Sequence, residues 1–543
     1  MLLINELIVA ALHEPPSLAE PATYAQAMSG PNAAKWRVAW QEELTQLANM
    51  GSWEEATPPP GAKMLTAKPV FQIKTQDGKV TRFKAHCTIR GCAQRPGIHY
   101  DDTFQPVSRA SSLRLLLTIA ATHDLEVLSA DFDAAYLNAP IDKEELYVRF
   151  PPGYQPSDLT ATCLRLLKSV YGLKQAGHLW WKLVEDALVE YGCQRVQSEW
   201  GLYTLCTDNK TTLLVLLYVN DIVATCIRSK SGKSQATDLF EFLGSRFSIT
   251  ILGPITHILG VTVTRNPANR SVAISQTAFI DTITDGLPGL SPVIAKHAPL
   301  PTPLPRSPDE PPASPAAACA YGTLIGKLLW LAFMTRPDVS FAVSYLARYT
   351  HAPTDYHIAL AVRVVAYLAN TRAMTLQLGG APAPLTVYTD SDWCADRDQR
   401  RSTSSLAAFL NGSLINWSSR RQRLVAHSTM EAEYIAAADA SHEILWMRTL
   451  LNEIGLPMTQ PTQLHIDNQA AIRLAANPTL HERSKHIELR HHIIRQLVDL
   501  GIITLHYVPT GQQRADGFTK PLSGPNTANF RNDIRLTLPS TNM

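Results

Sequence analysis

Two apolar runs flank an Asn-Gly pair in the sequence SLAAFLNGSLINW, residues 405–417. Asn-Gly is the strongest short hairpin signal, because both residues of the turn readily adopt positive φ angles. A short strand-like run at 385–389 precedes the hairpin. The segment therefore predicts three consecutive antiparallel strands.

Helical and strand signals alternate after the hairpin. Ser428 followed by Glu431 has the spacing of a capping box and predicts a helix that runs toward Gly455. Further patterns predict a strand at 463–466, helices at 468–475 and 482–500, and a strand at 502–508. These local signals predict the order βββαβαβα for the C-terminal part.

Four acidic residues fall at strand ends or in helices of this layout: Asp390, Glu433, Asp467 and Asp516, the last opening the final helix. A hydrolase that uses two Mg²⁺ ions about 3.5–4 Å apart needs several hard oxygen ligands of this kind. Any one of these acids is equally well explained by turn or cap chemistry. The set of four favours a metal site.

Composition sets the limits for the whole chain. Its 543 residues suggest three or four domains, and 45% hydrophobic with 18% charged residues is ordinary for a globular protein. The formal net charge of +2 excludes a strongly basic chain, so any site for a polyanion is expected to be local. The eight cysteines lack metal-ligand spacing, which predicts reduced intracellular thiols.

Neither a signal peptide nor a membrane segment is indicated. Asn5 and Glu6 interrupt the apolar N-terminal stretch, and it lacks a basic region. The apolar run at 213–219 is far shorter than the roughly 20 residues that span a bilayer. We expect no membrane role.

The upstream part has a mixed α+β pattern. Helical segments are predicted at 34–50 and 180–191, and a strand at 213–218. Nine prolines between Ser291 and Pro315 predict a linker or long surface loop. Helical spacing returns at 321–350 and 357–371.

Five arginines lie around the predicted hairpin and supply a local positive patch: Arg400, Arg401, Arg420, Arg421 and Arg423. Such a patch suits a nucleic-acid backbone. A solvated basic face remains an equal alternative.

The C-terminal motifs resemble the ribonuclease H domain of copia-type LTR retrotransposons. They are YTDSDW (388–393), RRSTSS (400–405), HSTMEAEY (427–434), HIDNQAA (465–471), RSKHIELR (483–490) and RADGFTKPL (514–522). The resemblance implies that Asp390, Glu433, Asp467 and Asp516 are the catalytic, metal-binding acids. Asp392 and Glu431 are neighbours that are easily confused with them.

The upstream motifs resemble the reverse transcriptase of the same polyprotein. They are EPATYAQAM (20–28), FKAHCTIRGCAQRPGIHYDDTFQPVSR (83–109), SADFDAAYLNAP (129–140), SVYGLKQAGHLWW (169–181), LLYVND (216–221), LGPITHILGV (252–261) and TRPDVSFAV (335–343). Together the two resemblances cover residues 20 to 522.

The resemblance implies a multidomain α+β fold, a right-hand polymerase followed by a ribonuclease H-like domain. We expect reverse transcriptase fingers and palm at 20–265 and a thumb-like segment with a proline-rich linker at 266–318. A helical connection is expected at 319–380 and the ribonuclease H domain at 381–525.

The resemblance also assigns the polymerase residues. A strand at 125–130 delivers the first metal ligand, Asp131, and a hairpin tip carries Asn220 and Asp221. Tyr136 would lie under the incoming sugar and exclude a 2′-hydroxyl. Three further residues would contact nucleotide or template: Gln175, Lys84 and Arg90.

The hairpin tip departs from the family pattern. The family has Tyr-x-Asp-Asp where this chain has Tyr218-Val219-Asn220-Asp221. An amide is an uncharged oxygen ligand, so Asn220 would neutralise Mg²⁺ poorly. The chain departs from the family pattern at three further places, with His86 for a basic residue, Gly177-His178 for Pro-Arg, and Ala139 for Gly.

The implied function is RNA-directed DNA polymerase with ribonuclease H, the polymerase being impaired by Asn220. Two Mg²⁺ ions per active site are the implied cofactors, with Mn²⁺ as a substitute, and the implied partners are RNA template, DNA primer, RNA-DNA hybrid and dNTPs. The alternative is a truncated, catalytically inactive remnant that at most binds nucleic acid.

The chain resembles the 3′ piece of a polyprotein, without motifs of a protease, an integrase or a zinc knuckle. Other polyprotein products are therefore possible partners, and a cytoplasmic particle or the nucleus is the implied location. A domesticated host structural protein is a third alternative, which no feature of the sequence supports.

Overall fold

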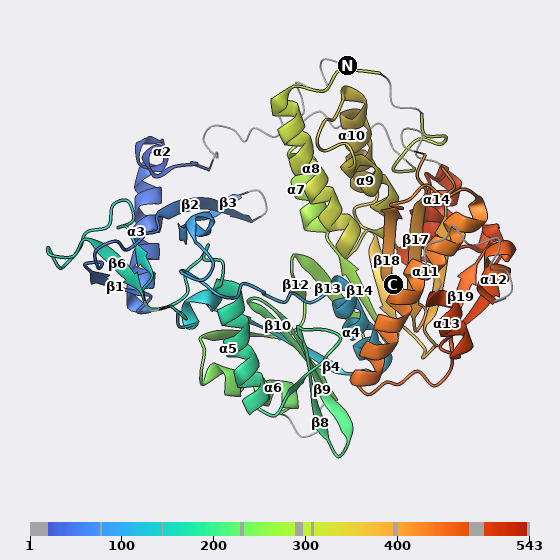
Figure 1. Cartoon of the computed structure of the whole chain (residues 1–543), viewed down its shortest axis with the longest axis horizontal. Helices are drawn as coiled ribbons and strands as arrows, with labels where there is room; N and C mark the ends of the chain where they lie inside the picture. The colour runs from blue at the N-terminus through green and yellow to red at the C-terminus, as the bar shows by residue number, and fades with distance from the viewer. Residues whose placement is uncertain are drawn as a thin grey trace.

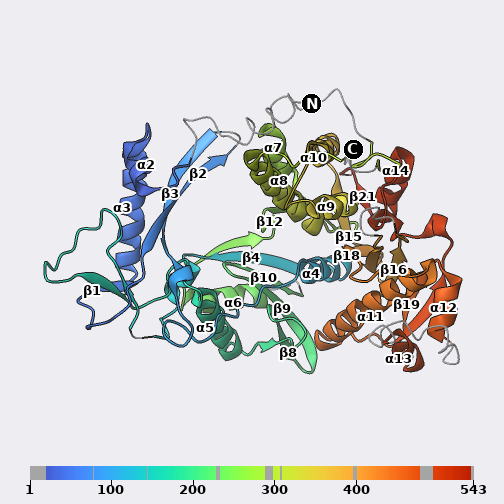
Figure 2. The ribbon, with the colours of Figure 1, turned by 45° about the horizontal axis from the view of Figure 1, so that its top comes forward.

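The computed structural model describes residues 20–539, except 77–78, 144, 228–232, 288–296, 306–308, 395–399 and 477–492. The described chain is a mixed α+β molecule. Figures 1 and 2 show the N-terminal elements at one end and the last sheet of the chain at the other, with a large sheet between them.

The N-terminal elements surround an aromatic core. They are α2 (Tyr24–Ser29), α3 (Ala33–Asn49), β1 (Trp53–Ala56), β2 (Ala67–Gln76), β3 (Lys79–Ile89), β5 (Tyr147–Val148) and β6 (Cys163–Leu166). Trp36 on α3 packs edge-on against Phe71 and Phe83 of the β2–β3 ribbon, with ring centroids 5.1 and 4.6 Å apart. Burial of these rings holds the ribbon against α3.

The central sheet has the strand order β11-β4-β10-β9-β8-β7. Its strands are β4 (Glu126–Phe132), β7 (Gln194–Arg195), β8 (Leu202–Thr207), β9 (Lys210–Tyr218), β10 (Asp221–Cys226) and β11 (Ile249–Pro254). Helices α5 (Ala176–Glu190) and α6 (Gln235–Gly244) cover one face, and α4 (Ala110–Thr122) covers the other. The alternation of side chains along each strand supplies both apolar faces.

A bridging sheet joins distant parts of the chain in the order β12-β13-β14-β15-β21. Its strands are β12 (His257–Ile258), β13 (Val261–Asn266), β14 (Ser271–Ser275), β15 (Thr375–Gly379) and β21 (Leu536–Thr537). A helical bundle accompanies it: α7 (Thr277–Asp285), α8 (Pro315–Met334), α9 (Ser340–Ala347) and α10 (Asp355–Asn370).

Helix α8 is long and apolar enough to cross a membrane by length and composition alone, with a mean hydropathy of 1.5 and 44% of that stretch buried. The sequence pattern predicted a helix here from residue 321 but did not indicate that it is apolar over this length. Its buried residues pack inside the helical bundle, and the Tyr321 hydroxyl donates to the Leu346 carbonyl at 2.7 Å. These contacts are those of a core helix.

The C-terminal sheet has the order β18-β17-β16-β19-β20. Its strands are β16 (Thr386–Ser391), β17 (Thr403–Leu410), β18 (Ser413–Arg421), β19 (Thr462–Ile466) and β20 (Ile503–Tyr507). The β16–β17–β18 pairs are antiparallel, whereas β16–β19 and β19–β20 are parallel. The helices are α11 (Thr429–Glu453), α12 (Gln469–Ala476), α13 (Ile493–Asp499) and α14 (Gly524–Asp533).

Most local predictions for this part agree with the structure, but two helices, α12 and α13, lie between β19 and β20 where the predicted order βββαβαβα has one. Asn411 and Gly412 have φ angles of 54° and 71° in the β17–β18 turn. The Ser428 hydroxyl accepts from the Glu431 amide, although Glu431 returns its carboxylate to the His427 amide instead of to Ser428. The predicted helix at 482–500 lies largely outside the described residues, which include only α13.

Three expectations need correction or adjustment. Asp516 does not open the last α-helix, because it begins a single 3₁₀ turn (Asp516–Phe518) and Pro521 interrupts the chain before α14. The helix expected at 321–350 is broken at Pro337 between α8 and α9. The domain boundary expected at 265/266 falls inside β13, and the one expected at 318/319 falls inside α8. Ser314 caps the N-terminus of α8.

Arg114 joins the central sheet to the helical bundle and the C-terminal sheet. This α4 residue is buried, and its guanidinium donates to the carbonyls of Ile415, Phe333 and Met334 at 2.8–3.1 Å. It also lies 3.9 Å from the ring centroid of Trp417. Burial lowers the pKa of Arg114 to about 9. Carbonyls at the end of α8 offset the charge, as helix C-termini do for cations.

A buried ion pair ties the helical bundle together. Arg336 donates to both carboxylate oxygens of Asp338, at 2.9 and 2.7 Å, and to the carbonyl and hydroxyl of Thr371. The Tyr367 hydroxyl also donates to Asp338, at 2.6 Å. Both charged side chains are at most 1% exposed.

Replacing Asp338 by Asn is expected to lower the free energy of unfolding by about 3–5 kcal/mol, because it leaves the Arg336 charge buried without a counterion. Asp281→Asn is the matched control. Asp281 lies 3.7 Å from the guanidinium of Arg372, and both side chains are substantially exposed. The free energy of unfolding should therefore fall by no more than about 1 kcal/mol in this variant. Urea unfolding measures both values, and equal losses would contradict the prediction.

Candidate active sites

Two carboxylates meet where two inner strands of the central sheet, β4 and β10, have their ends. Asp131 lies near the end of β4 and Asp221 begins β10, and the two residues are cross-strand partners. Directly opposed antiparallel residues have Cα atoms about 4.5–5.5 Å apart. The Phe132 amide donates to the Asn220 carbonyl at 2.8 Å and fixes this register. The structure therefore brings together the two acids that were predicted to bind metal.

Asn220 lies in the turn beside these acids. The turn of Val219 and Asn220 joins β9 to β10, Val219 has a φ of 40°, and Trp180 Nε1 donates to the Val219 carbonyl at 2.6 Å. Asn220 itself is exposed. Backbone hydrogen bonds and Trp180 hold the turn in shape. The side chain at position 220 therefore affects the charge of the turn and is not needed for its conformation.

The environment of these acids disfavours their negative charges. Burial and the nearby Asp131 raise the pKa of Asp221 to about 6. Burial and Asp133 raise the pKa of Asp131, while Lys84 opposes the shift. Lys84 therefore favours the charged form of Asp131, whereas contact of Lys84 with template or triphosphate remains a prediction. A bound cation would relieve the repulsion between the acids.

The other predicted nucleotide residues lie in different settings. Tyr136 is half-buried, with its ring centroid 5.7 Å from that of Tyr171. Arg90 is exposed after β3. Gln175 is fully buried, where its amide donates to the His99 carbonyl and accepts from Gln94. Contact of Gln175 with a nucleotide remains a prediction.

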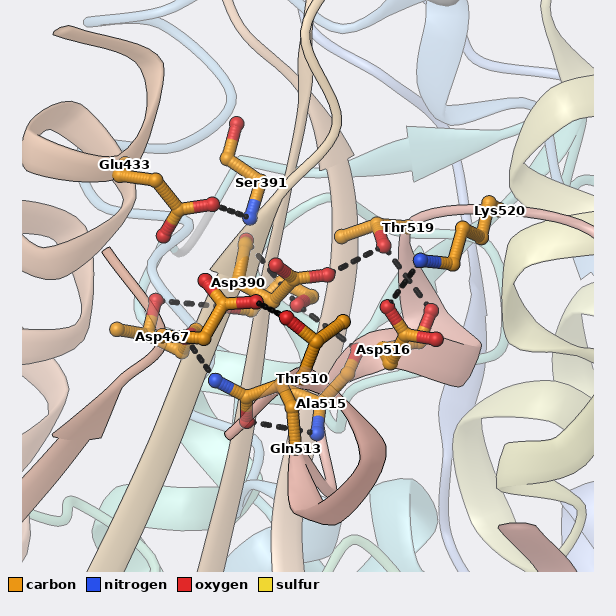
Figure 3. A network of polar contacts seen from close by, with 12 residues as sticks. Asp390, Ser391, Glu433, Asp467, Thr510, Gln513, Ala515, Asp516, Thr519 and Lys520 are labelled. Atoms are coloured by element: carbon orange, nitrogen blue, oxygen red, sulfur yellow. Dashed lines mark hydrogen bonds and ion pairs between the residues drawn. The ribbon is translucent and has the colours of Figure 1, made fainter. Parts of the chain in front are cut away.

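A second, tighter group of acids lies in the C-terminal sheet. Ligand oxygens of Asp390, Glu433 and Asp467 lie within 4.8 Å of one another (Figure 3). Asp390 comes from β16 and Asp467 follows β19, its parallel neighbour, while α11 carries Glu433. Asp390 and Glu433 are buried.

Each carboxylate of this acid cluster is held by a hydrogen bond. The Ser391 amide donates to Glu433 at 2.8 Å, the Thr519 hydroxyl to Asp390 at 2.6 Å, and the Thr510 hydroxyl to Asp467 at 2.9 Å (Figure 3). Among the described residues, the second Glu433 oxygen has no hydrogen-bond partner although it is buried. A buried oxygen of this kind beside two carboxylates fits a divalent cation.

Asp516 lies beside the acid cluster but differs from its members. It forms an ion pair with Lys520, four residues later, as Figure 3 shows. Burial raises the pKa of Asp516, partly offset by Lys520. Lys520 therefore balances the charge of this fourth acid.

Burial raises the pKa of Asp390 to about 6, with contributions from Asp516 and Asp467 that Thr519 opposes. Burial, Asp390 and Asp467 raise the pKa of Glu433 to about 10. Several buried negative charges at one point are unfavourable. A bound cation would relieve this repulsion, so the acid cluster fits a metal ion. Mg²⁺ is a hard cation that prefers carboxylate oxygens.

Without divalent cations, the melting temperature is expected to fall as the pH rises from 5 to 8. Folding raises the pKa of Asp390 to about 6 and that of Glu433 to about 10, so the protonated carboxyls stabilise the folded state at low pH. The contribution of Asp390 is lost as the pH rises through about 6, and that of Glu433 continues to fall toward pH 8. Mg²⁺ at pH 8 should restore stability by binding the folded state.

Differential scanning fluorimetry with EDTA or Mg²⁺ measures these melting temperatures. Asp390→Asn is the control, because it should show a weaker pH dependence and a smaller response to Mg²⁺. The same pH and Mg²⁺ responses in both proteins would contradict the prediction.

Sequence reasoning missed three residues that position the acids. Thr519 and Lys520 follow Asp516 by three and four positions, the spacing that places side chains on one face of a helical turn. That spacing was a usable signal within the quoted motif. Thr510 carried no signal, because its contact with Asp467 spans 43 positions of the chain.

Comparisons with known proteins place the chain among retroelement proteins. A family model described as reverse transcriptase (RNA-dependent DNA polymerase) matches residues 51–299. The retrovirus-related Pol polyprotein from transposon RE1 of Arabidopsis thaliana is 33% identical over 524 residues, 95% of this chain and 35% of that protein. A putative transposon Ty5-1 protein of Saccharomyces cerevisiae is 30% identical over 322 residues, 58% of this chain and all of that protein.

The chain thus spans about a third of the length of the RE1 polyprotein. A solved structure of a foamy viral protease-reverse transcriptase in complex with double-stranded DNA has a TM-score of 0.47 at 12% identity, covering 87% of this chain and 70% of that one.

Proposed function

Because the chain belongs to the reverse transcriptase family of copia-type retrotransposon Pol polyproteins, we propose that it combines an RNA-directed DNA polymerase with a ribonuclease H that cleaves RNA in RNA-DNA hybrids. The polymerase is impaired by Asn220. The observation that carries the proposal is the intact acid cluster of Asp390, Glu433 and Asp467, with oxygens within 4.8 Å of one another.

The C-terminal sheet supports the ribonuclease H half. Its five strands, three antiparallel followed by two parallel, agree with the ribonuclease H-like architecture that the motifs imply. Two bound Mg²⁺ ions would supply a metal-activated water and stabilise the leaving oxygen of a phosphodiester. Asp390, Glu433 and Asp467 would hold these ions, with Asp516 available as a fourth ligand. Thr519 and Thr510 orient Asp390 and Asp467.

The polymerase half rests on Asp131 and Asp221, which lie opposite each other across two strands. They would bind Mg²⁺, with Mn²⁺ as a substitute, and Lys84 would contact template or triphosphate. Tyr136 excludes a ribose 2′-hydroxyl by its bulk. Asn220 contributes no charge where the family has a second aspartate, so a bound metal pair would be held less well.

The proposed partners follow from these activities. They are an RNA template, a DNA primer, dNTPs and the resulting hybrid, inside a cytoplasmic particle or the nucleus. Products of the rest of a polyprotein are further proposed partners, since the chain spans 35% of the RE1 protein.

A remnant that binds nucleic acid without catalysis is the second candidate, favoured by Asn220. Assaying the purified chain for RNA cleavage in a labelled hybrid and for primer extension on RNA, with Mg²⁺ and with Mn²⁺, separates the two. We expect cleavage with weak or absent extension. Hybrid binding without cleavage in either metal would refute the proposed function and support the remnant.

A further inference from the structure

Lys520 places an ammonium group beside the acid cluster. Its Nζ forms an ion pair with Oδ1 of Asp516, four residues earlier in the chain (Figure 3). Partial burial works against the charge of Lys520, but contact with Asp516 and the charges of Asp390 and Asp467 raise its pKa above the ordinary value. The ammonium therefore interacts with three of the four acids of the proposed metal site.

The backbone that carries Lys520 is fixed to the acids, whereas its side chain is not enclosed. The hydroxyl of Thr519 donates to the Asp390 carboxylate at 2.6 Å and to the Asp516 carbonyl at 3.0 Å. Thr519 is buried, but the side chain of Lys520 is 44% exposed. Because a lysine carries its charge on a flexible four-carbon stem, the ammonium can leave Asp516 for solvent without a change in the backbone.

Asp516 differs in this respect from the three other acids. Oxygens of Asp390, Glu433 and Asp467 lie within 4.8 Å of one another, and among the residues that the structure describes Asp516 is not a member of that group. Its carboxylate is paired with Lys520. A divalent ion that used Asp516 as a ligand would have to displace the ammonium from it.

The charges give the same result. Four ionised carboxylates and Lys520 together carry a charge of −3, and one divalent ion reduces it to −1. A second divalent ion would leave a surplus of +1 while Lys520 stays in place, but would reach neutrality without it. Since a nearby like charge disfavours a cation, Lys520 opposes the second ion and not the first.

We propose that the ammonium of Lys520 takes the place of a second divalent ion at Asp516, so that the two cations compete for this carboxylate. The inference rests on the proposed function and assigns Lys520 a positioning role in its metal site. With Lys520 in place, one ion would be held by Asp390, Glu433 and Asp467. A second ion would bind only where the ammonium leaves Asp516.

The test is the number of divalent ions bound by Lys520→Gln. Mn²⁺ is the probe, because electron paramagnetic resonance measures the free ion and gives the bound ion by difference. We expect Lys520→Gln to bind about one more Mn²⁺ per chain than the native protein, since a carboxylate becomes available as a hard oxygen ligand. The difference between the two proteins is unaffected by ions at Asp131 and Asp221, which both contain.

Three variants serve as controls. Lys520→Gln/Asp516→Asn should bind the native number of ions, because the carboxylate that was freed is absent. Lys520→Arg keeps a positive charge beside Asp516 and should also match the native number. Lys182→Gln removes an exposed lysine from α5 and controls for the change in net charge. A single cooperative thermal transition in EDTA shows that each variant is folded.

Equal numbers of ions in Lys520→Gln and the native protein, including none in either, would overturn the inference. An additional ion that persists in the double variant would overturn it too, because Asp516 would not be the ligand involved. Cleavage of a labelled RNA-DNA hybrid by the native chain, assayed in parallel, reports on the proposed function separately. An additional ion in Lys520→Gln without cleavage by the native chain would support the role of Lys520 and refute the proposed function.

Discussion

Replacing Asp390 by Asn is expected to lower the rate of RNA cleavage by about a thousandfold or more, about 4 kcal/mol of transition-state stabilisation. Asp390 is at the centre of the acid cluster, because its pKa responds to Asp516 and Asp467 and that of Glu433 responds to it. An amide keeps the shape and removes the charge. Single-turnover cleavage of a labelled hybrid with saturating Mg²⁺ measures the loss.

Glu431→Gln is the matched control. Glu431 lies two positions before Glu433 on α11, but its carboxylate accepts from the His427 amide and belongs to the helix cap. Its replacement should cost about 1 kcal/mol of stability and leave cleavage within about tenfold of native. Equal losses of cleavage in both variants would show that the acid cluster is not the catalytic site.

Replacing Asn220 by Asp is expected to raise primer extension with Mg²⁺ by about a hundredfold or more, about 2.7 kcal/mol. Asn220 is exposed and directly precedes Asp221, the cross-strand partner of Asp131, so a carboxylate there would add the charge that the proposed metal site lacks. The backbone of the turn and Trp180 already hold the required shape. Gel-based extension of a primer on RNA gives the rate.

Asp131→Asn is the inactive control for this comparison. The native chain should extend primers close to that background with Mg²⁺, and somewhat better with Mn²⁺. If the native chain extends primers as fast as Asn220→Asp does, the amide of Asn220 suffices as a ligand. No extension by Asn220→Asp would place the defect elsewhere, for example at Ala139 or His178.

Local signals predicted the elements of the C-terminal sheet because their causes are local. The turn at Asn411 and Gly412 needs only positive φ angles, and the cap at Ser428 needs only its own first turn. The prediction that Asp516 opens the last helix was wrong, because the chain forms only one 3₁₀ turn there before Pro521. Directly after this turn, the Thr519 hydroxyl donates to Asp390. A hydrogen bond that spans 129 positions leaves no trace in a local pattern.

The sequence by itself determined the kinds of groups that the protein offers: the acids, the arginines after the hairpin, and the amide at position 220. The tertiary structure decided which of them meet. Parallel pairing of β16 with β19 brings Asp390 close to Asp467. Burial by segments that are distant in the sequence raises the pKa of Asp390. Arg114 is bound by carbonyls from two other parts of the chain. Such contacts depend on burial and distance, which arise only when remote segments pack together.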